Sequence, residues 1–127
     1  MKLLLDTHVL LWALADDPRL GTTIRTEIER PSDTLFVSAA TIWEVEIKVA
    51  LGKLSLGEEL VGVLVGSSIE TLPISWFHAQ TAGRLPRHHG DPFDRMLIAQ
   101  AQCDGLTLVS NDHAFAQYDV SIFDPSD

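Results

Sequence analysis

The stretch KLLLDTHVLLWALA, residues 2–15, decides how the whole sequence is interpreted. Residues 2–5 are a compact apolar run typical of a buried strand, and residues 7–15 follow with an apolar pattern that favours a helix. A basic residue followed by apolar residues also suits a secretory signal peptide. However, Asp6 and His8 interrupt the apolar run, and no small-residue cleavage pattern closes it. We therefore interpret the stretch as a first strand followed by a first helix.

Short apolar runs and helical patterns continue to alternate along the chain. This alternation indicates a parallel sheet covered on both faces. Pro73 places its strand at an edge or an end, because proline cannot donate a ladder hydrogen bond. We expect a three-layer α/β/α fold with a central, mainly parallel sheet, in a single domain of residues 1–127. The expected strands are 2–5, 34–38, 69–75, 106–110 and 120–124, and the expected helical segments are 7–15, 21–30, 41–52, 58–68, 75–85, 92–104 and 112–118.

The composition is that of a protein with a packed core. Hydrophobic residues make up 46% of the 127 residues, which excludes an intrinsically disordered chain. No apolar run reaches the roughly 18 residues of a membrane span, so no membrane partner is expected. Cys103 is the only cysteine, which excludes an internal disulfide and suits the reducing cytoplasm.

The formal net charge of −9 bears on the class of ligand. Proteins that bind nucleic acid usually carry net positive charge, so an acidic chain argues against that partner at first sight. Carboxylates that gather around Mg²⁺ raise the acidic count while they build a site for a phosphate. The net charge therefore does not exclude a phosphodiester substrate.

Four acidic residues map to one edge of the expected sheet. Asp6 follows the first strand, and Asp112 follows a later strand after one Asn. Glu44 lies near the start of the helix after the second strand. Asp94 opens the helix that runs back into the strand before Asp112, so it starts where that strand ends. Ligand sites of parallel sheets lie beyond the carboxyl ends of the strands, which is the rim that these acids share.

Each acid also has a local explanation as a helix cap. Asp91, Pro92 and Asp94 fit the N-cap, N1 and N3 positions of one helix. Thr41 and Glu44 form the T-x-x-E pattern of a capping box. The other two acids can cap the segments that follow them.

Together, the four acids indicate a metal site. Carboxylates converging on one rim would repel one another strongly unless a cation lay among them. Oxygen ligands favour Mg²⁺, or Mn²⁺ in its place. Zinc ranks below magnesium, because His88 and His89 are adjacent and no H-x-x-x-H or Cys/His spacing accompanies them.

The sequence resembles PIN-domain ribonucleases, most closely the VapC-type toxins of bacterial toxin–antitoxin pairs. The resembling segments are LLLDTHVLLW (3–12), SAATIWEVEIK (38–48), DPFDRMLIAQA (91–101) and LVSNDHAF (108–115), in family order. The resemblance implies a PIN-like fold, and it implies that the family's catalytic, metal-binding acids are Asp6, Glu44, Asp94 and Asp112. Ser110 matches a small hydroxyl residue before the last acid, which we assign to the substrate site, and Asp91 remains an N-cap.

This resemblance also implies a mechanism. One or two Mg²⁺ ions would bridge the carboxylates and the scissile phosphate, and a metal-bound water would attack phosphorus in line. Asp6 and Asp94 are expected as primary ligands, while Glu44 and Asp112 complete the shell or orient the water. The expected products of RNA cleavage are a 5′-phosphate and a 3′-hydroxyl.

A basic stretch, GRLPRHHGDPFDR (83–95), lies next to the expected site. Arg87 and Arg95 are candidate contacts for RNA phosphates. The alternative is a solvated loop in which Arg95 pairs with a neighbouring acid.

The helix at 41–52 has apolar residues on more than one side. Trp43, Ile47 and Leu51 recur at helical spacing beside a second apolar stripe. The second face is either buried as well or a groove for an amphipathic partner. The resemblance favours a groove, because VapC-type toxins are silenced by an antitoxin segment that lies along the toxin, and it also implies a homodimer.

Other classes of function compete with the nuclease. A catalytically inactive PIN-like module would bind RNA or protein, but it has no need of four mutually repelling acids. A haloacid-dehalogenase-type phosphatase requires D-x-D after the first strand, where residues 6–8 read D-T-H. A receiver domain requires an acidic pair there and a late lysine, and no lysine follows Lys53.

Overall fold

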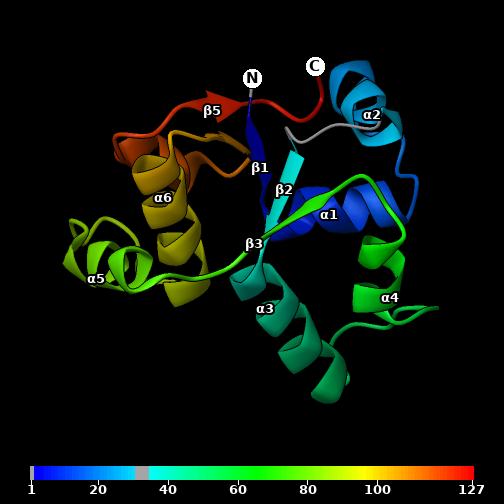
Figure 1. Ribbon diagram of the computed structural model, residues 1–127, viewed down its shortest axis with the longest axis horizontal. Coiled ribbons are helices and arrows are strands. Elements are labelled where there is room, and N and C mark those ends of the chain that lie inside the picture. The colour runs from blue at the N-terminus through cyan, green and yellow to red at the C-terminus, as the bar shows by residue number, and fades with distance from the viewer. Residues whose placement is uncertain (1, 31–34) are drawn as a thin grey trace.

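A five-stranded parallel sheet lies between two layers of helices in the computed structural model, which describes residues 2–30 and 35–127 (Figure 1). The strand order is β3-β2-β1-β4-β5, and every neighbouring pair is parallel. The strands are β1 (Leu3–Leu5), β2 (Leu35–Ser38), β3 (Glu70–Leu72), β4 (Thr107–Val109) and β5 (Ile122–Phe123). The helices are α1 (Thr7–Leu14), α2 (Thr22–Glu29), α3 (Ala39–Ala50), α4 (Leu60–Val65), α5 (Trp76–Arg84), α6 (Pro92–Asp104) and the 3₁₀ helix η1 (His113–Gln117). The expected three-layer α/β/α fold is confirmed.

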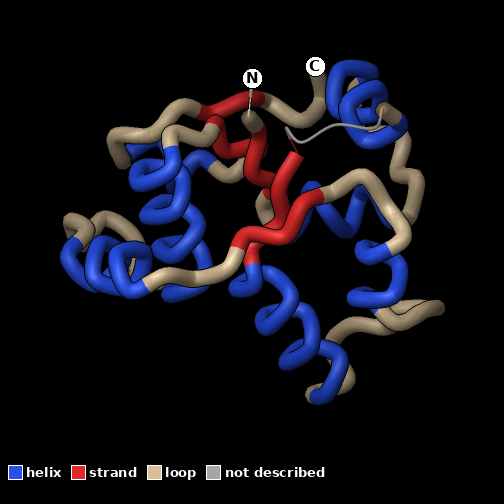
Figure 2. Tube along the Cα trace, in the orientation of Figure 1, coloured by secondary structure: helices blue, strands red, loops and turns tan. Residues whose placement is uncertain are grey.

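The central strand β1 supplies both hydrophobic cores. Successive side chains of a strand point to opposite faces of the sheet. Leu3 and Leu5 accordingly lie in one core with residues of α1, α2 and α4, whereas Leu4 lies in the other with residues of α5 and α6. Figure 2 shows these helices on the two sides of the strands. The sheet is therefore covered on both faces, as its apolar strands predict.

The edge position predicted for the strand before Pro73 is confirmed, since β3 is an outer strand of the sheet. The strand expected at 34–38 begins at Leu35, and residue 34 lies outside the described residues. The helix expected at 58–68 is shorter, spanning Leu60–Val65 and ending at Gly66, a poor helix former. Within the described part of the chain, no helix is long and apolar enough to cross a membrane.

Helix α3 begins earlier than expected, at Ala39. The Ser38 hydroxyl caps it by accepting a hydrogen bond from the Ala40 amide at 3.0 Å. The predicted capping box of Thr41 and Glu44 is therefore wrong, because both residues lie inside the helix and a serine at the strand end serves as the cap.

A tight turn joins α6 to β4. Gly105 adopts a left-handed conformation (φ 66°) directly after α6, and the Leu106 amide bonds back to the Ala101 carbonyl at 2.9 Å. The chain therefore reverses at once, and the start of α6 lies at the sheet edge where β4 ends. That edge also carries the start of α1 and the start of α3.

Candidate active site

Asp6 lies between the central strand and α1 and is buried (4% exposed). Its Oδ1 accepts a hydrogen bond from the Val9 amide at 2.8 Å, which confirms the predicted N-cap. Burial raises the pKa of Asp6, the Ser110 hydroxyl lowers it through a hydrogen bond, and the charge of Asp112 raises it. A nearby cation would stabilise the charged form of this carboxylate.

Glu44 is a buried residue of α3 whose two carboxylate oxygens both have partners. The Thr7 hydroxyl donates to Oε1 at 2.6 Å, and the Lys48 ammonium donates to Oε2 at 3.1 Å. Lys48 lies one helical turn away, at the spacing that favours such a pair. Thr7 follows Asp6, so its hydrogen bond fixes α1 against α3.

Asp94 is the third residue of α6 and lies close to other charged groups. Asp91 caps this helix as predicted, with Oδ1 accepting from the amides of Phe93 at 2.8 Å and Asp94 at 3.1 Å. The His89 imidazole Nε2 lies 2.8 Å from Asp94 Oδ2. Burial raises the pKa of Asp94 to about 6, against the lowering effect of His89, and the charges of Asp91 and Glu44 also raise it.

Asp112 and Ser110 follow β4. Asp112 caps η1, since its Oδ1 accepts from the Ala114 amide at 2.9 Å. The Asp112 amide in turn donates to the Ser110 hydroxyl at 3.0 Å. Ser110 is buried and also bonds to Asp6, so it connects two of the acids. Its contact with a substrate stays a prediction.

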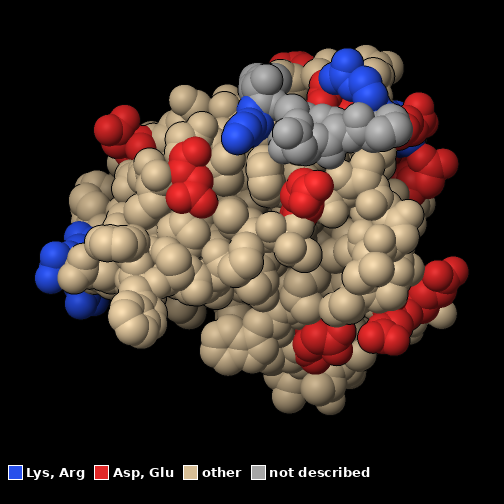
Figure 3. All heavy atoms as spheres, viewed as in Figure 1, with Lys and Arg blue, Asp and Glu red and all other residues tan. Residues whose placement is uncertain are grey.

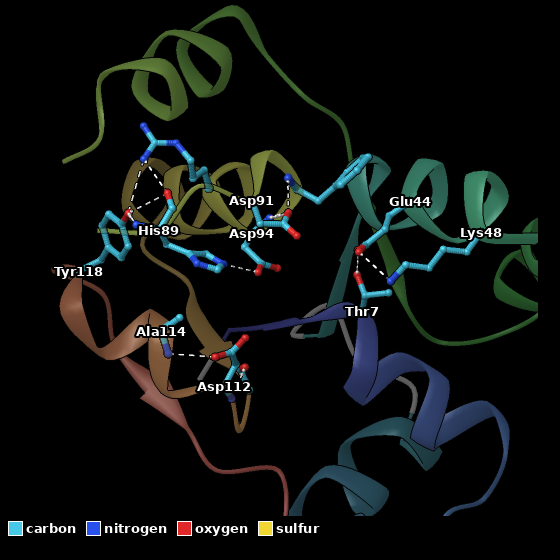
Figure 4. A network of polar contacts seen from close by, with 12 residues as sticks. Thr7, Glu44, Lys48, His89, Asp91, Asp94, Asp112, Ala114 and Tyr118 are labelled. Atoms are coloured by element: carbon cyan, nitrogen blue, oxygen red, sulfur yellow. Dashed lines mark hydrogen bonds and ion pairs between the residues drawn. The ribbon is translucent and has the colours of Figure 1, made fainter. Parts of the chain in front are cut away.

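The four acids occupy one rim. Figure 4 shows Glu44, Asp94 and Asp112 projecting toward one space from α3, from α6 and from the segment after β4. The charges of Asp6 and Asp112 act on each other, and so do those of Asp94 and Glu44. Within residues 2–30 and 35–127, no three His, Cys, Asp or Glu side chains lie close enough together to enclose a metal ion. The carboxylates therefore border a common space without converging on one point.

The donor atoms on this rim suit a hard divalent cation. Carboxylate oxygens are the ligands that Mg²⁺ and Mn²⁺ prefer. The raised pKa values of Asp6 and Asp94 reflect charges that burial disfavours, and a cation would reverse that effect. The adjacent histidines have other contacts: His89 meets Asp94, and the His88 ring lies edge-on to Tyr118 at 5.2 Å.

Arg95 and Tyr118 hold the loop between α5 and α6. The Tyr118 hydroxyl accepts from the His89 amide and donates to the Pro86 carbonyl, each at 2.9 Å. The Arg95 guanidinium donates at 2.9–3.2 Å to the backbone carbonyls of Ala82, Leu85, Pro86 and His89, and more weakly, at 3.5 Å, to the Tyr118 hydroxyl. The predicted alternative, that Arg95 pairs with a neighbouring acid, is wrong because these carbonyls surround its guanidinium. Arg87 is exposed in the same loop.

Several residues that support the acids do not follow from the sequence patterns above. Lys48 could have been found from its spacing to Glu44, and Thr7 from its place beside Asp6. His89 and Tyr118 carry no such signal, because they meet their partners across loops. Sequence periodicity identifies neighbours within one helix or strand, but it does not identify contacts that loop residues make with other segments.

The outer face of α3 is open to solvent. Trp43 is 64% exposed and Leu51 is 63% exposed, while Ile47 is half-buried. The alternative in which both faces of this helix are buried is therefore wrong. Trp43 borders an apolar hollow beside the edge strand β3, and Trp76 of α5 is 93% exposed.

Comparisons with known proteins agree with this architecture. The PIN domain family model matches residues 3–121. Ribonuclease VapC22 from Mycobacterium tuberculosis (strain ATCC 25618 / H37Rv) is 33% identical over 117 residues, which cover 86% of this chain and 85% of that protein. A chain in the crystal structure of DNA-bound VapBC from Salmonella typhimurium superposes with a TM-score of 0.72 at 22% identity, covering 97% of both chains. A chain in the crystal structure of FitAcB from Neisseria gonorrhoeae gives 0.71 at 24% identity, covering 97% of both.

Proposed function

The chain belongs to the PIN-domain family, and on this premise we propose that it is a Mg²⁺-dependent endoribonuclease, the toxin of a toxin–antitoxin pair. The observation that carries the proposal is the pair Asp6 and Asp94. Both are carboxylates whose pKa is raised by burial, and they lie on one rim with two further acids. The similarity to a ribonuclease over most of the chain supports RNA as the substrate.

We assign Asp6 and Asp94 as the primary ligands of the metal, with Glu44 and Asp112 completing the site. A bound Mg²⁺, or Mn²⁺ in its place, would act as a Lewis acid and ease a water toward hydroxide. The protein itself orients the carboxylates that would bind the metal. The Val9 amide fixes Asp6 and His89 fixes one oxygen of Asp94, so each presents a defined orientation.

The substrate backbone would contact the loop between α5 and α6. Arg87 is exposed there, beside His88 and His89, and can reach a phosphate. Arg95 would act through the shape of this loop, because its guanidinium is occupied by carbonyls. Ser110 would position Asp6 at the other side of the rim.

The exposed apolar residues of α3 and α5 support protein partners. Trp43, Trp76 and Phe77 are 64%, 93% and 76% exposed, which is unusual for side chains of this size. We propose that these surfaces serve an antitoxin segment and a second copy of the chain. We place the protein in the cytoplasm, where its RNA substrate and its single free thiol both fit.

The proposal is tested by cleavage of end-labelled RNA with Mg²⁺ or Mn²⁺ and with EDTA. Asp94→Asn should lower the rate by at least about 100-fold, since outer-shell partners of a metal alone account for 10–100-fold. Asp119→Asn, an exposed aspartate after η1, is the matched control and should cut like wild type.

Equal cutting by wild type and Asp94→Asn would assign the activity to a contaminant and remove the support for this site. If no RNA is cut and calorimetry detects no metal binding that depends on Asp94, the catalytically inactive binding module takes the place of the nuclease.

A further inference from the structure

A groove of about 570 Å³ borders the acidic rim on the side of β5. It shares Asp112 with the rim and is not part of the basic loop between α5 and α6. The residues of this groove that matter below are Trp12, Arg19, Asn111, Asp112, His113 and Asp124.

Arg19 presents a fixed planar surface in this groove. Its guanidinium carbon lies 4.6 Å from the centroid of the Trp12 ring, which packs against the core. Asp17 holds the guanidinium edge with two hydrogen bonds, from Nε at 3.0 Å and from Nη2 at 2.7 Å. The Arg19 side chain nevertheless remains 66% exposed. The guanidinium is thus ordered on one side and open to solvent on the other.

The charge around Arg19 does not suit a phosphate. The bidentate Asp17 already balances the guanidinium, and that contact lowers the pKa of Asp17 to about 2, so this carboxyl is ionised at neutral pH. Asp112 and Asp124 add negative charge to the groove. An RNA phosphate would therefore meet net repulsion in the groove. The face of the molecule drawn in Figure 3 also carries acidic side chains at several separate places, in keeping with the net charge of −9.

The same features suit a nucleobase. Bases of single-stranded RNA stack on guanidinium planes and aromatic rings, and stacking does not require net positive charge. The groove also offers groups for the edge of a base, because Asn111 and His113 are exposed. Asp124 Oδ1 accepts from the Ser126 amide and hydroxyl, at 2.9 and 2.7 Å, which fixes this carboxylate as well.

We propose that this groove binds one unpaired nucleobase of the RNA, stacked on the outer face of Arg19, next to Asp112. The proposal rests on the proposed function, and it adds the part of the substrate that is recognised and the residues that select it. Arg19 would hold the base by stacking and Asn111 and His113 would select it through its edge, while the acids on the rim carry out the cleavage.

The first experiment measures binding without cleavage. Trp43→Phe/Trp76→Phe leaves Trp12 as the only tryptophan, and its fluorescence is titrated in EDTA with AMP, GMP, CMP, UMP and ribose 5-phosphate. At least one nucleotide should bind more tightly than ribose 5-phosphate. Arg19→Lys keeps the positive charge but removes the planar guanidinium on which the base would stack. It should therefore weaken that binding about fivefold or more, given the usual strength of base stacking. Arg30→Lys, an exposed arginine paired with Glu27, is the control and should change nothing.

Equal affinity for ribose 5-phosphate and the nucleotides would identify a phosphate site and overturn the proposal. Unchanged nucleotide binding in Arg19→Lys would overturn it as well, because Arg19 would then only brace the turn after α1.

The second experiment separates this proposal from the nuclease itself. With RNAs that differ at single positions around the cut, Arg19→Lys should reduce the preference for one base at one position by about fivefold or more. If wild type cuts RNA and Arg19→Lys leaves every base preference unchanged, the nuclease proposal is supported and the nucleobase site is refuted. If the nucleotides bind as expected but wild type cuts no RNA, the nucleobase site is supported and the nuclease proposal is refuted.

Discussion

Glu44 and Asp94 lie on the same rim, yet the chain supports them differently. Glu44 has a partner on each oxygen, a hydroxyl from Thr7 and an ammonium from Lys48. Asp94 has one imidazole contact, which lowers its pKa, but burial and the charges of two nearby acids outweigh that contact and raise the pKa to about 6. The negative charge of Glu44 is already stabilised by its partners within the chain. The charge of Asp94 is not, so Asp94 gains more from an external cation. We therefore expect Glu44 mainly to fix the shape of the rim and Asp94 to be the stronger metal ligand.

The largest difference between the two acids should appear in metal affinity. Asp94→Asn should weaken Mg²⁺ binding by about 100-fold or more if Asp94 is a primary ligand, as proposed. Glu44→Gln should weaken it by only about 10-fold, because Lys48 already balances that charge. Isothermal titration calorimetry at matched ionic strength measures both. Equal losses would mean that the two acids share the ion and that the distinction fails.

The loop that carries His89 to Asp94 can be loosened at Arg95. Arg95→Ala removes the guanidinium from four carbonyls, of which that of Pro86 keeps a strong hydrogen bond from Tyr118, and should lower the free energy of unfolding by about 2–3 kcal/mol. Urea denaturation measures the effect. Arg87→Ala, in the same loop but exposed, should stay within about 0.5 kcal/mol of wild type. A small effect at Arg95 would show that the loop is held by other contacts.

The raised pKa of Asp94 predicts the direction in which stability changes with pH. Because the folded-state value of about 6 exceeds the ordinary 3.8, the contribution of Asp94 to stability falls as the pH rises through this range. Asp94→Asn does not titrate, so in EDTA its stability advantage over wild type should grow by about 1–2 kcal/mol between pH 4.5 and pH 7.5.

Glu44→Gln is the comparison for that pH series. It should destabilise the protein at both pH values, because it disrupts the contacts with Thr7 and Lys48. Thermal denaturation of the two variants and wild type, at about pH 4.5 and about pH 7.5, gives the result. An Asp94→Asn advantage that does not change with pH would contradict the raised pKa.

The smallest effect concerns Lys48. Lys48→Met should change stability by only about 0.3–0.5 kcal/mol, the usual contribution of such a pair on a helix. It should also strengthen Mg²⁺ binding slightly, because it removes a cation from Glu44. Weaker Mg²⁺ binding in this variant would show that Lys48 orients Glu44 as a ligand rather than competing with the ion.

The sheet and the rim follow from simple sequence features. Apolar runs that end in Asp6 or just before Asp112, and a helix that opens with Asp94, are enough to bring the acids to one edge. The start of α3 does not follow, because Ser38 and Thr41 are both good N-caps and only the tertiary structure decides between them.

The finer features of the site lie beyond sequence reasoning. Arg95 and Tyr118 were unpredictable as supports of the loop because their partners are backbone carbonyls and amides, which every residue possesses. The degree to which the acids close around an ion depends on side-chain positions, which spacing does not encode. Their roles as metal ligands stay a prediction that the experiments above decide.

The position of β1 has a consequence for how the protein matures. β1 is the central strand, and it pairs with β4, where Leu3 lies opposite Thr107. This contact joins segments more than a hundred residues apart, so forming it is slow compared with forming local structure. The first strand must wait until β4 has been synthesised before its second edge is covered. Asp6 and Asp112 therefore meet only after β4 has been synthesised, and the proposed active site cannot form on a nascent chain that lacks this strand.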